Sequence, residues 1–263
     1  MESGASVRLS GENAAENGLR FKMTMDKTEY EAILAETGEG KTYSAVEFGI
    51  LIAPSSYDEE NALDEKNVFG IGGEAIYDWA EYIEGEWIYT GEKIRIINLV
   101  SAEMAEYEGE MVLYGAATNL GADSDLLIEE FIGKGYILFT MADGTQSCVF
   151  ANANDNVRSM AYVAQMAIEN DESLSETEKS WLQTNYVSPV TDREANYTVE
   201  YYLYENGEYV LSAEATEVLS GNIDSPVTAE IKVFDGFIHN ENAAGTVLNG
   251  KIWADGSLVL KLF

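Results

Sequence analysis

The stretch YTVEYYLYENGEYVLSAEATEVL, residues 197–219, reads as a strand, a turn and a returning strand. Apolar and polar side chains alternate along its first half, and this period of two is typical of a pleated strand. Asn206-Gly207 follows, the dipeptide that most readily takes the positive φ angles of a two-residue hairpin turn. A second alternating run begins at Tyr209. The stretch therefore predicts a β-hairpin.

The two faces of this hairpin differ in polarity. The more apolar face, which we expect to point inward, consists of Tyr197, Val199, Tyr201 and Leu203. Tyr202 and Tyr204 share the other face with Thr198 and Glu200, so we expect them to stand outward. Outward tyrosines suit contact with a protein or a glycan, and they equally suit cross-strand packing with Val210. Tyr202 and Tyr204 are candidate ligand-binding residues, with both interpretations open at this point.

The segment VSPVTDREAN, residues 187–196, separates two different patterns. It holds one of only three prolines and is rich in polar residues, which is typical of a linker. Two helix patterns precede it, at 154–170 and 174–187, and only strand signals follow. In the second helix, Ser175 and Glu178 match the capping-box pattern. The sequence therefore predicts a domain at 1–188, a linker at 189–196 and a small domain at 197–263.

The region before the two helices is rich in strand patterns. GLRFKMTM (18–25) alternates, and EFGILIAP (47–54) is a continuous apolar run of the kind that is buried on both sides. Further candidates are ASVRLS (5–10), KIRIINLV (93–100), EMVLYGAA (110–117), GYILFT (135–140) and SCVFANA (147–153). Turn residues separate these segments, which indicates an antiparallel sheet or sandwich. The predicted class is α+β and β-rich, with two helices at the end of the first domain.

Charge excludes two classes of partner. The formal net charge is −32, from 47 acids and 15 bases. Such a surface repels phosphate backbones and anionic headgroups, so we expect neither nucleic acid nor membrane lipid as a partner. Cys148 is the single cysteine and packs as a small hydrophobe in its expected hairpin. His239 is the single histidine, so any site that needs two histidines is excluded.

The order of motifs after residue 197 resembles a known family. YTVEYYLYENGEYVL, ATEVLSG, VTAEIKVFDGFIHNE and LNGKIWADGSLVLKLF are similar to the mucin-binding-protein-type repeat of Gram-positive surface proteins. The resemblance implies a small β-grasp-like domain at 197–263, an extracellular location, either wall-attached or secreted, and a host or matrix glycan or glycoprotein as partner. Because the pattern of that family continues past Leu262-Phe263, we expect a monomeric fragment of a longer chain.

The first region carries a second, less informative resemblance. GASVRLSGENAAENGLRFKM, EFGILIAPSSY, GYILF and NVRSMAYVAQMAI resemble segments of an uncharacterised domain in large extracellular proteins of gut clostridia. This resemblance covers most of residues 4–188. It implies a location and no mechanism, and it supplies no catalytic residue to match.

The densest aromatic stretch is DWAEYIEGEWIYTG, residues 78–91. Its rings, Trp79, Tyr82, Trp87 and Tyr89, are candidate ligand-binding residues. Sugars stack on aromatic faces while nearby carboxylates accept hydrogen bonds from sugar hydroxyls, so the stretch could form a carbohydrate-binding surface. The alternative is that these rings pack the edge of a sheet or the core, where large aromatics contribute burial energy.

Acidic side chains give weaker signals. A glycoside hydrolase needs two carboxyl groups about 5 to 9 Å apart across a cleft, and chance pairs are common among 47 acids. The segment GADSDL, with Asp123 and Asp125, could supply oxygen ligands to a structural calcium ion, but turn chemistry explains it equally well. We therefore expect no catalytic residue and no cofactor beyond such a calcium.

These observations predict a non-enzymatic cell-surface or secreted module. Its expected role is adhesion, or that of a spacer that presents adhesive modules. The alternative is a carbohydrate-binding module that uses exposed tryptophan and tyrosine, and a glycoside hydrolase is a further, less favoured one.

Overall fold

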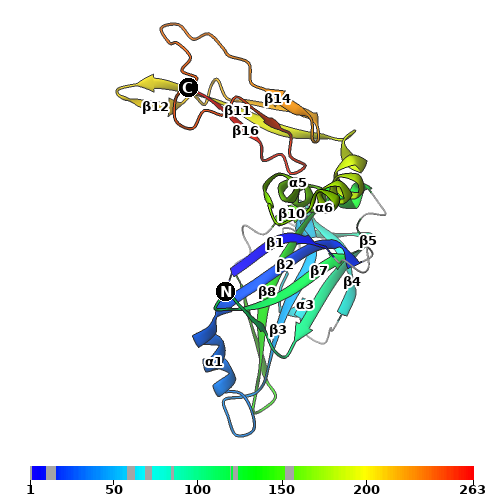
Figure 1. Cartoon of the computed structure of the whole chain (residues 1–263). Coiled ribbons are helices and arrows are strands. Elements are labelled where there is room, and N and C mark those ends of the chain that lie inside the picture. Colours follow the sequence, from blue (N-terminus) through cyan, green and yellow to red (C-terminus); the bar gives the residue numbers. More distant parts are fainter. Residues whose placement is uncertain are drawn as a thin grey trace. The chain divides into compact units, whose positions relative to one another are not determined.

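A computed structural model describes residues 2–9, 16–57, 63–68, 73–83, 86–118, 120, 124–151 and 157–263. Within these ranges only the backbone is described for 2–5, 66–67, 73–83, 86–95 and 124. The chain forms two compact units, Met1–Ala122 with Glu129–Val163, and Asp123–Ile128 with Ala164–Phe263. Figure 1 follows the chain through the elements of both.

The first unit is built mainly from strands. Its strands are β1 (Glu2–Arg8), β2 (Gly18–Asp26), β3 (Tyr43–Pro54), β4 (Gly73–Ile83), β5 (Glu86–Ser101), β6 (Ala105–Tyr107), β7 (Glu110–Thr118), β8 (Glu130–Met141), β9 (Gln146–Phe150) and β10 (Val157–Ser159). Helices α1 (Lys27–Ala35) and α3 (Glu65–Val68) lie between them, and α5 (Met160–Asn170) begins within this unit. The sequence analysis missed α1, whose first turn is capped by the Asp26 carboxylate.

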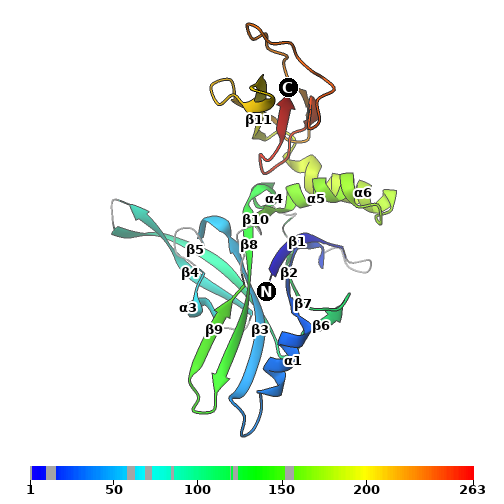
Figure 2. The ribbon, with the colours of Figure 1, turned by 90° about the vertical axis from the view of Figure 1, so that its left-hand side faces the viewer.

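Two antiparallel sheets of this unit pack against each other (Figure 2). One has the order β1-β2-β7-β6, and the other has the order β10-β8-β3-β5-β4 with β9 paired to β8. Glycines let the sheets approach closely, since a Cβ atom on Gly133 would lie 2.3 Å from Phe21 and one on Gly135 would lie 2.5 Å from Met23. Phe21 and Met23 are fully buried, which confirms the alternation predicted for residues 18–25.

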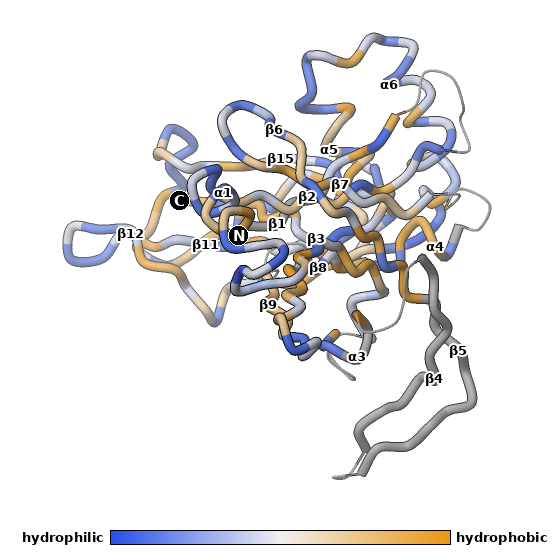
Figure 3. The backbone as a smooth tube through the Cα atoms, turned by 90° about the horizontal axis from the view of Figure 1, so that it is seen from below, coloured by the Kyte–Doolittle hydropathy of each residue, from blue (hydrophilic) through white to orange (hydrophobic). Residues whose placement is uncertain are grey.

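Strand β3 is buried on both faces, as its continuous apolar run predicts. Ile50 and Ile52 face Gly115 of β7, in the other sheet. Leu51 and Ala53 point the opposite way, into a second cluster that includes Tyr136. Residues 48–53 of β3 are all buried, and Figure 3 shows hydrophobic stretches of the chain where β3 and β8 lie. The sheet that contains β3 therefore forms the middle layer of the unit.

The second unit begins with helices and ends with strands. Its elements are α4 (Ser124–Ile128), most of α5, α6 (Glu176–Leu182), a π-helical turn (Gln183–Val187), a 3-10 turn (Ser188–Val190), β11 (Glu194–Glu205), β12 (Glu208–Leu211), β13 (Glu217–Asn222), β14 (Pro226–Thr228), β15 (Asn249–Lys251) and β16 (Val259–Leu262). The Ser175–Glu178 capping box is confirmed in both directions at the start of α6.

Strand β11 is the centre of the second unit's sheet. Antiparallel β12 and β13 pair along one edge of β11, and β16 pairs in parallel along the other. Strands β14 and β15 form a separate antiparallel pair. Residues 194–263 thus place their first and last strands side by side, which is a β-grasp-like arrangement. The α+β, β-rich class predicted from the sequence is confirmed.

One helix boundary differs from that expected. The helix predicted at 154–170 begins only at Met160, because Val157–Ser159 pairs with β8 as β10. The segment 189–196 contains the fully buried Val190 and the start of β11, and the two compact units divide within α5. Whether residues 197–263 fold by themselves stays a prediction.

Candidate functional site

A tight turn sets the register of the predicted hairpin. Asn206 and Gly207 have φ angles of 51° and 95°, the left-handed values that this dipeptide favours. The register places Tyr204 opposite Tyr209 and Tyr202 opposite Leu211. Val199 and Tyr201 are buried while Tyr204 is 58% exposed. Val199 and Tyr201 therefore point inward and Tyr204 outward as expected, whereas Tyr197, Tyr202 and Leu203 are all half-buried.

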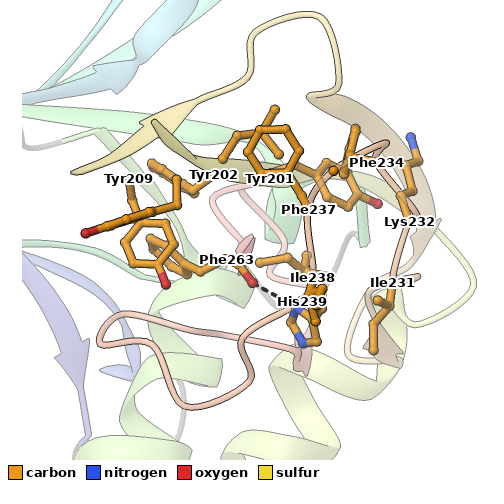
Figure 4. A pocket seen from close by; sticks show the side chains of 14 residues that line it. Tyr201, Tyr202, Tyr209, Ile231, Lys232, Phe234, Phe237, Ile238, His239 and Phe263 are labelled. Atoms are coloured by element: carbon orange, nitrogen blue, oxygen red, sulfur yellow. Dashed lines mark hydrogen bonds between the residues drawn. The ribbon is translucent and has the colours of Figure 1, made fainter. Parts of the chain in front are cut away.

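A cavity of about 310 Å³ opens beside the end of β11 (Figure 4). Its walls come from the ends of β11 and β16, the start of β12 and the irregular segment 231–239. The aromatic part of the lining consists of Tyr201, Tyr202, Tyr204, Tyr209, Phe234, Phe237 and Phe263. Ile231, Ile238, Leu203 and Leu262 add aliphatic surface. The cavity lies wholly within the second unit.

The rings on one side of the cavity pack on each other. Tyr202 stacks on Phe263 with ring centroids 4.6 Å apart and an interplanar angle of 13°. Tyr209 meets Phe263 edge-on at 5.0 Å, and Tyr204 meets Tyr209 at 5.1 Å. Such stacked and edge-to-face pairs fix ring positions. This wall of the cavity is therefore formed before any ligand arrives.

Two of the tyrosine hydroxyls that line the cavity are engaged within the protein. The Tyr202 hydroxyl donates to the Glu200 carboxylate at 2.7 Å, and this bond raises the pKa of Tyr202. The Tyr201 hydroxyl donates to the backbone oxygen of Glu230 at 2.9 Å, and burial, reinforced by the Glu217 carboxylate, raises the pKa of Tyr201 to about 12. Both phenols are therefore neutral at physiological pH.

Charged and imidazole groups at the cavity have partners as well. The Lys232 ammonium lies 2.6 Å from the Glu217 carboxylate and over the Tyr201 ring. His239 Nδ1 lies 3.0 Å from the backbone oxygen of Phe263, drawn as a dashed line in Figure 4, while its buried Nε2 makes no hydrogen bond. The lining thus offers chiefly apolar surface to an incoming group.

Segment 229–248 is irregular, although only strand signals were recognised in this part of the sequence. Alternation in AEIKVFDGFIHN favours a strand, but β14 ends at Thr228 and the chain turns at Gly236, with φ at 84°. The segment is held to β16 by backbone bonds from Asn240 to Phe263 and between Val247 and Lys261. Sequence reasoning missed Phe237 and Ile238 as lining residues, because only the fold brings them opposite β11.

The other four candidate ligand-binding residues lie in the first unit. Trp79, Tyr82, Trp87 and Tyr89 lie on β4 and β5, and their side chains are outside the described part of the chain. The backbone pairs Tyr82 with Trp87 and Ala80 with Tyr89, close to the end of a long two-stranded ribbon. These residues lie in the first unit, and the cavity that Tyr202 and Tyr204 line lies in the second.

The candidate calcium residues cannot both be placed. Asp123 lies outside the described residues, and the Asp125 carboxylate accepts a hydrogen bond from the Arg193 guanidinium. Across the described ranges, no three histidine, cysteine or acidic side chains gather as a metal site. Of the helices in these ranges, none has the length and apolar character to cross a membrane.

Comparison with known proteins adds little to this geometry. No protein-family model matches the chain, and no curated protein matches it. Among solved structures, the chain is similar to the major pilin subunit BcpA of Bacillus cereus, with 10% identity and a TM-score of 0.17. The match covers 99% of this chain and 69% of the pilin chain. A TM-score this low carries no argument about fold or function.

Proposed function

We propose that the chain is a non-enzymatic module of a Gram-positive cell-surface or secreted protein, acting in adhesion or as a spacer that presents adhesive modules. The observation that carries the proposal is the preformed aromatic cavity beside β11. Concave apolar sites with fixed rings are built for binding. The motif order at 197–263 resembles a repeat of surface proteins, which supports the location.

The chemistry of the cavity supports binding rather than catalysis. Two of its phenols, Tyr201 and Tyr202, already donate hydrogen bonds to Glu230 and Glu200, and its lysine is paired with a carboxylate, so these groups are engaged within the fold rather than free to act on a substrate. His239 is the single histidine, and its Nδ1 already faces a backbone oxygen. The acidic surface supports partners other than nucleic acid and membrane lipid.

The proposal is tested by adhesion of the whole chain. Purified chain on beads is exposed to immobilised mucin, enzymatically deglycosylated mucin and serum albumin, and retention is measured under flow. Retention on mucin above that on albumin supports adhesion. Equal retention on all three surfaces would remove adhesion and leave the spacer role, and release of free sugars from the mucin would contradict a non-enzymatic role.

A second candidate is a carbohydrate-binding surface on the β4–β5 ribbon. The register favours it, because Tyr82 lies opposite Trp87, with Tyr89 two residues further along the same strand. The double variant Trp79→Ala/Trp87→Ala should then lose binding on a glycan array while its circular dichroism stays unchanged. Unchanged glycan binding in this variant would remove the ribbon as the site.

A further inference from the structure

We propose that the cavity beside β11 takes one large apolar side chain from a peptide segment of a partner protein, and that lysine or arginine flanks this side chain. The proposal deepens the adhesive role and rests on it, because it names the chemistry of the partner. It is carried by three features of the cavity: its size and rim, its engaged donors, and the charge around it.

The size of the cavity suits a single ring-sized group. Its volume, about 310 Å³, is at the lower end of the roughly 300–1,000 Å³ of ligand pockets. One tryptophan, phenylalanine or leucine side chain would be enclosed on the sides by Tyr209, Phe263 and Phe237 (Figure 4). An extended oligosaccharide would place most of its rings outside.

Exposed apolar side chains surround the opening. Ile238 is 93% exposed, Tyr204 58% and Ile231 53%, and all three line the cavity. Large apolar groups are rarely left in water together without a partner that covers them. They extend the apolar surface beyond the cavity, so a peptide main chain lying across the opening would cover them while its side chain fills the interior.

The engaged donors favour an apolar side chain over a sugar. A sugar hydroxyl that enters an apolar site without a hydrogen-bond partner loses free energy. The Tyr201 and Tyr202 hydroxyls donate to Glu230 and Glu200, and the Lys232 ammonium is paired with Glu217. A sugar hydroxyl could bind to these three groups only by breaking their bonds, whereas a hydrocarbon side chain leaves them intact.

The charge around the cavity indicates why lysine or arginine should flank the apolar side chain of the partner. In residues 194–263, which the structure describes completely, the cationic side chains are Lys232, Lys251 and Lys261. Each of them lies within 4 Å of a carboxylate. Exposed carboxylates stand within two residues of the lining along the chain, at Glu205 and Glu208 of the hairpin and at Asp235 and Glu241 of the irregular segment. This excess of negative charge near an apolar cavity is complementary to an apolar residue between lysines or arginines.

The test uses a fluorescein-labelled peptide, Gly-Lys-Lys-Trp-Lys-Lys-Gly, and fluorescence anisotropy with the full chain. Two further peptides replace its Trp by Ala or its four Lys by Glu. The protein variants are Ile238→Ser and the matched control Val233→Ser. Val233 is 94% exposed in the same segment but does not line the cavity. Both substitutions leave the core untouched, so folding should be preserved in each.

We expect the Kd of the tryptophan peptide to rise about tenfold in Ile238→Ser and to stay unchanged in Val233→Ser. The alanine peptide should bind at least about tenfold more weakly than the tryptophan peptide, the glutamate peptide should not bind, and added NaCl should weaken binding. Equal binding of the tryptophan and alanine peptides would reduce the interaction to surface charge and overturn the proposal.

Other outcomes separate this inference from the adhesive role. Displacement of the peptide by a neutral oligosaccharide, or an Ile238-dependent dimer in light scattering, would assign the cavity to a sugar or to a second copy and overturn the peptide proposal. Mucin retention that is insensitive to Ile238→Ser, together with no peptide binding, would overturn the proposal and leave the adhesive role standing. Peptide binding without retention on any surface would support the peptide proposal and overturn the adhesive role.

Discussion

The ring of Tyr136 covers Gly49 so closely that a methyl group on Gly49 would lie 2.1 Å from Tyr136 Cζ. The two residues are paired across β3 and β8, and Tyr136 is 1% exposed. The buried tyrosine therefore occupies the space that any side chain at position 49 would need.

Gly49→Ala should destabilise the first unit by about 3 kcal/mol, since overpacking forces the ring or the strand to move. The measurement is urea unfolding followed by tryptophan fluorescence. The double variant Gly49→Ala/Tyr136→Ala should lose less than the sum of the two single changes, because removing the ring relieves the clash. Strict additivity would show that the ring is not the obstacle.

Tyr136 also predicts alkaline instability. Burial raises its pKa to about 12, above the value of about 10 for a tyrosine in an unfolded chain. Its contribution to stability is fully present below pH 10 and is lost as the pH rises from about 10 towards 12, where the unfolded state releases the proton first.

The urea midpoint should therefore fall between about pH 10 and pH 12, and the fall should be smaller in Tyr136→Phe. That variant also loses the 2.7 Å hydrogen bond from the hydroxyl to Asn98 Oδ1, so it should be less stable at pH 8 by about 1 kcal/mol. Tyr107→Phe, at a 58% exposed position, is the control for the fluorescence change. The same pH dependence in wild type and Tyr136→Phe would contradict the assignment.

Cys148 should be chemically slow in the folded protein. Burial, with a smaller effect of the Glu65 carboxylate, raises the pKa of its thiol to about 12, and only the thiolate is an effective nucleophile. At pH 8, iodoacetamide should alkylate Cys148 at least about tenfold more slowly than it alkylates the thiol of free glutathione. Alkylation should become fast in urea, and a rapid reaction without urea would mean that the strand β9 opens readily.

Gln165 joins α5 to the strands of the second unit. Its Nε2 donates to the backbone oxygen of Ile252 at 3.2 Å, and its Oε1 accepts from the backbone nitrogen of Ala254 at 2.9 Å. Gln165→Leu should therefore destabilise this unit by about 1–3 kcal/mol, because the Ala254 N–H loses its acceptor and the Ile252 oxygen keeps only its bond from the Asp224 N–H. Glu169→Ala on the same helix is the control. It removes an exposed pair with Lys251 and should cost less than about 1 kcal/mol.

The hydrogen bonds of Gln165 lead to a prediction about where the small domain begins. A fragment of residues 164–263 should unfold at higher urea than one of 197–263, because only the longer one contains Gln165 and its helix. Circular dichroism and urea titration of both fragments decide the matter. Equal midpoints would support the predicted boundary at 189–196 and show that α5 is not part of the folding unit.

Much of the fold could be predicted from local signals. The Asn206-Gly207 turn, the capping box at Ser175 and the burial on both faces of β3 each follow from a few neighbouring residues. Local patterns fail to predict secondary structure where pairing with a segment distant in the sequence determines it. Val157 continues an apolar helical stripe, yet it lies in β10 because Ile132 of β8 is available to pair with it.

The candidate site was predictable in part, for the same reason. Tyr202 and Tyr204 follow from the alternation of β11, and both line the cavity. Phe237 and Ile238 lie in a segment that looks like a strand in the sequence, and they reach the cavity only because Asn240 and Val247 attach that segment to β16. No pattern within the segment encodes those attachments.

The parallel pairing of β11 with β16 has a mechanical consequence. The strand that opens the C-terminal sheet and the strand that closes it run in the same direction, joined from Thr198–Val259 to Tyr201–Leu262. A pull at Glu194 and Phe263 slides these strands past each other, so their backbone bonds resist the force together rather than breaking in succession. Under shear flow, this sheet should stay folded at tensions that would unzip a hairpin such as β11–β12.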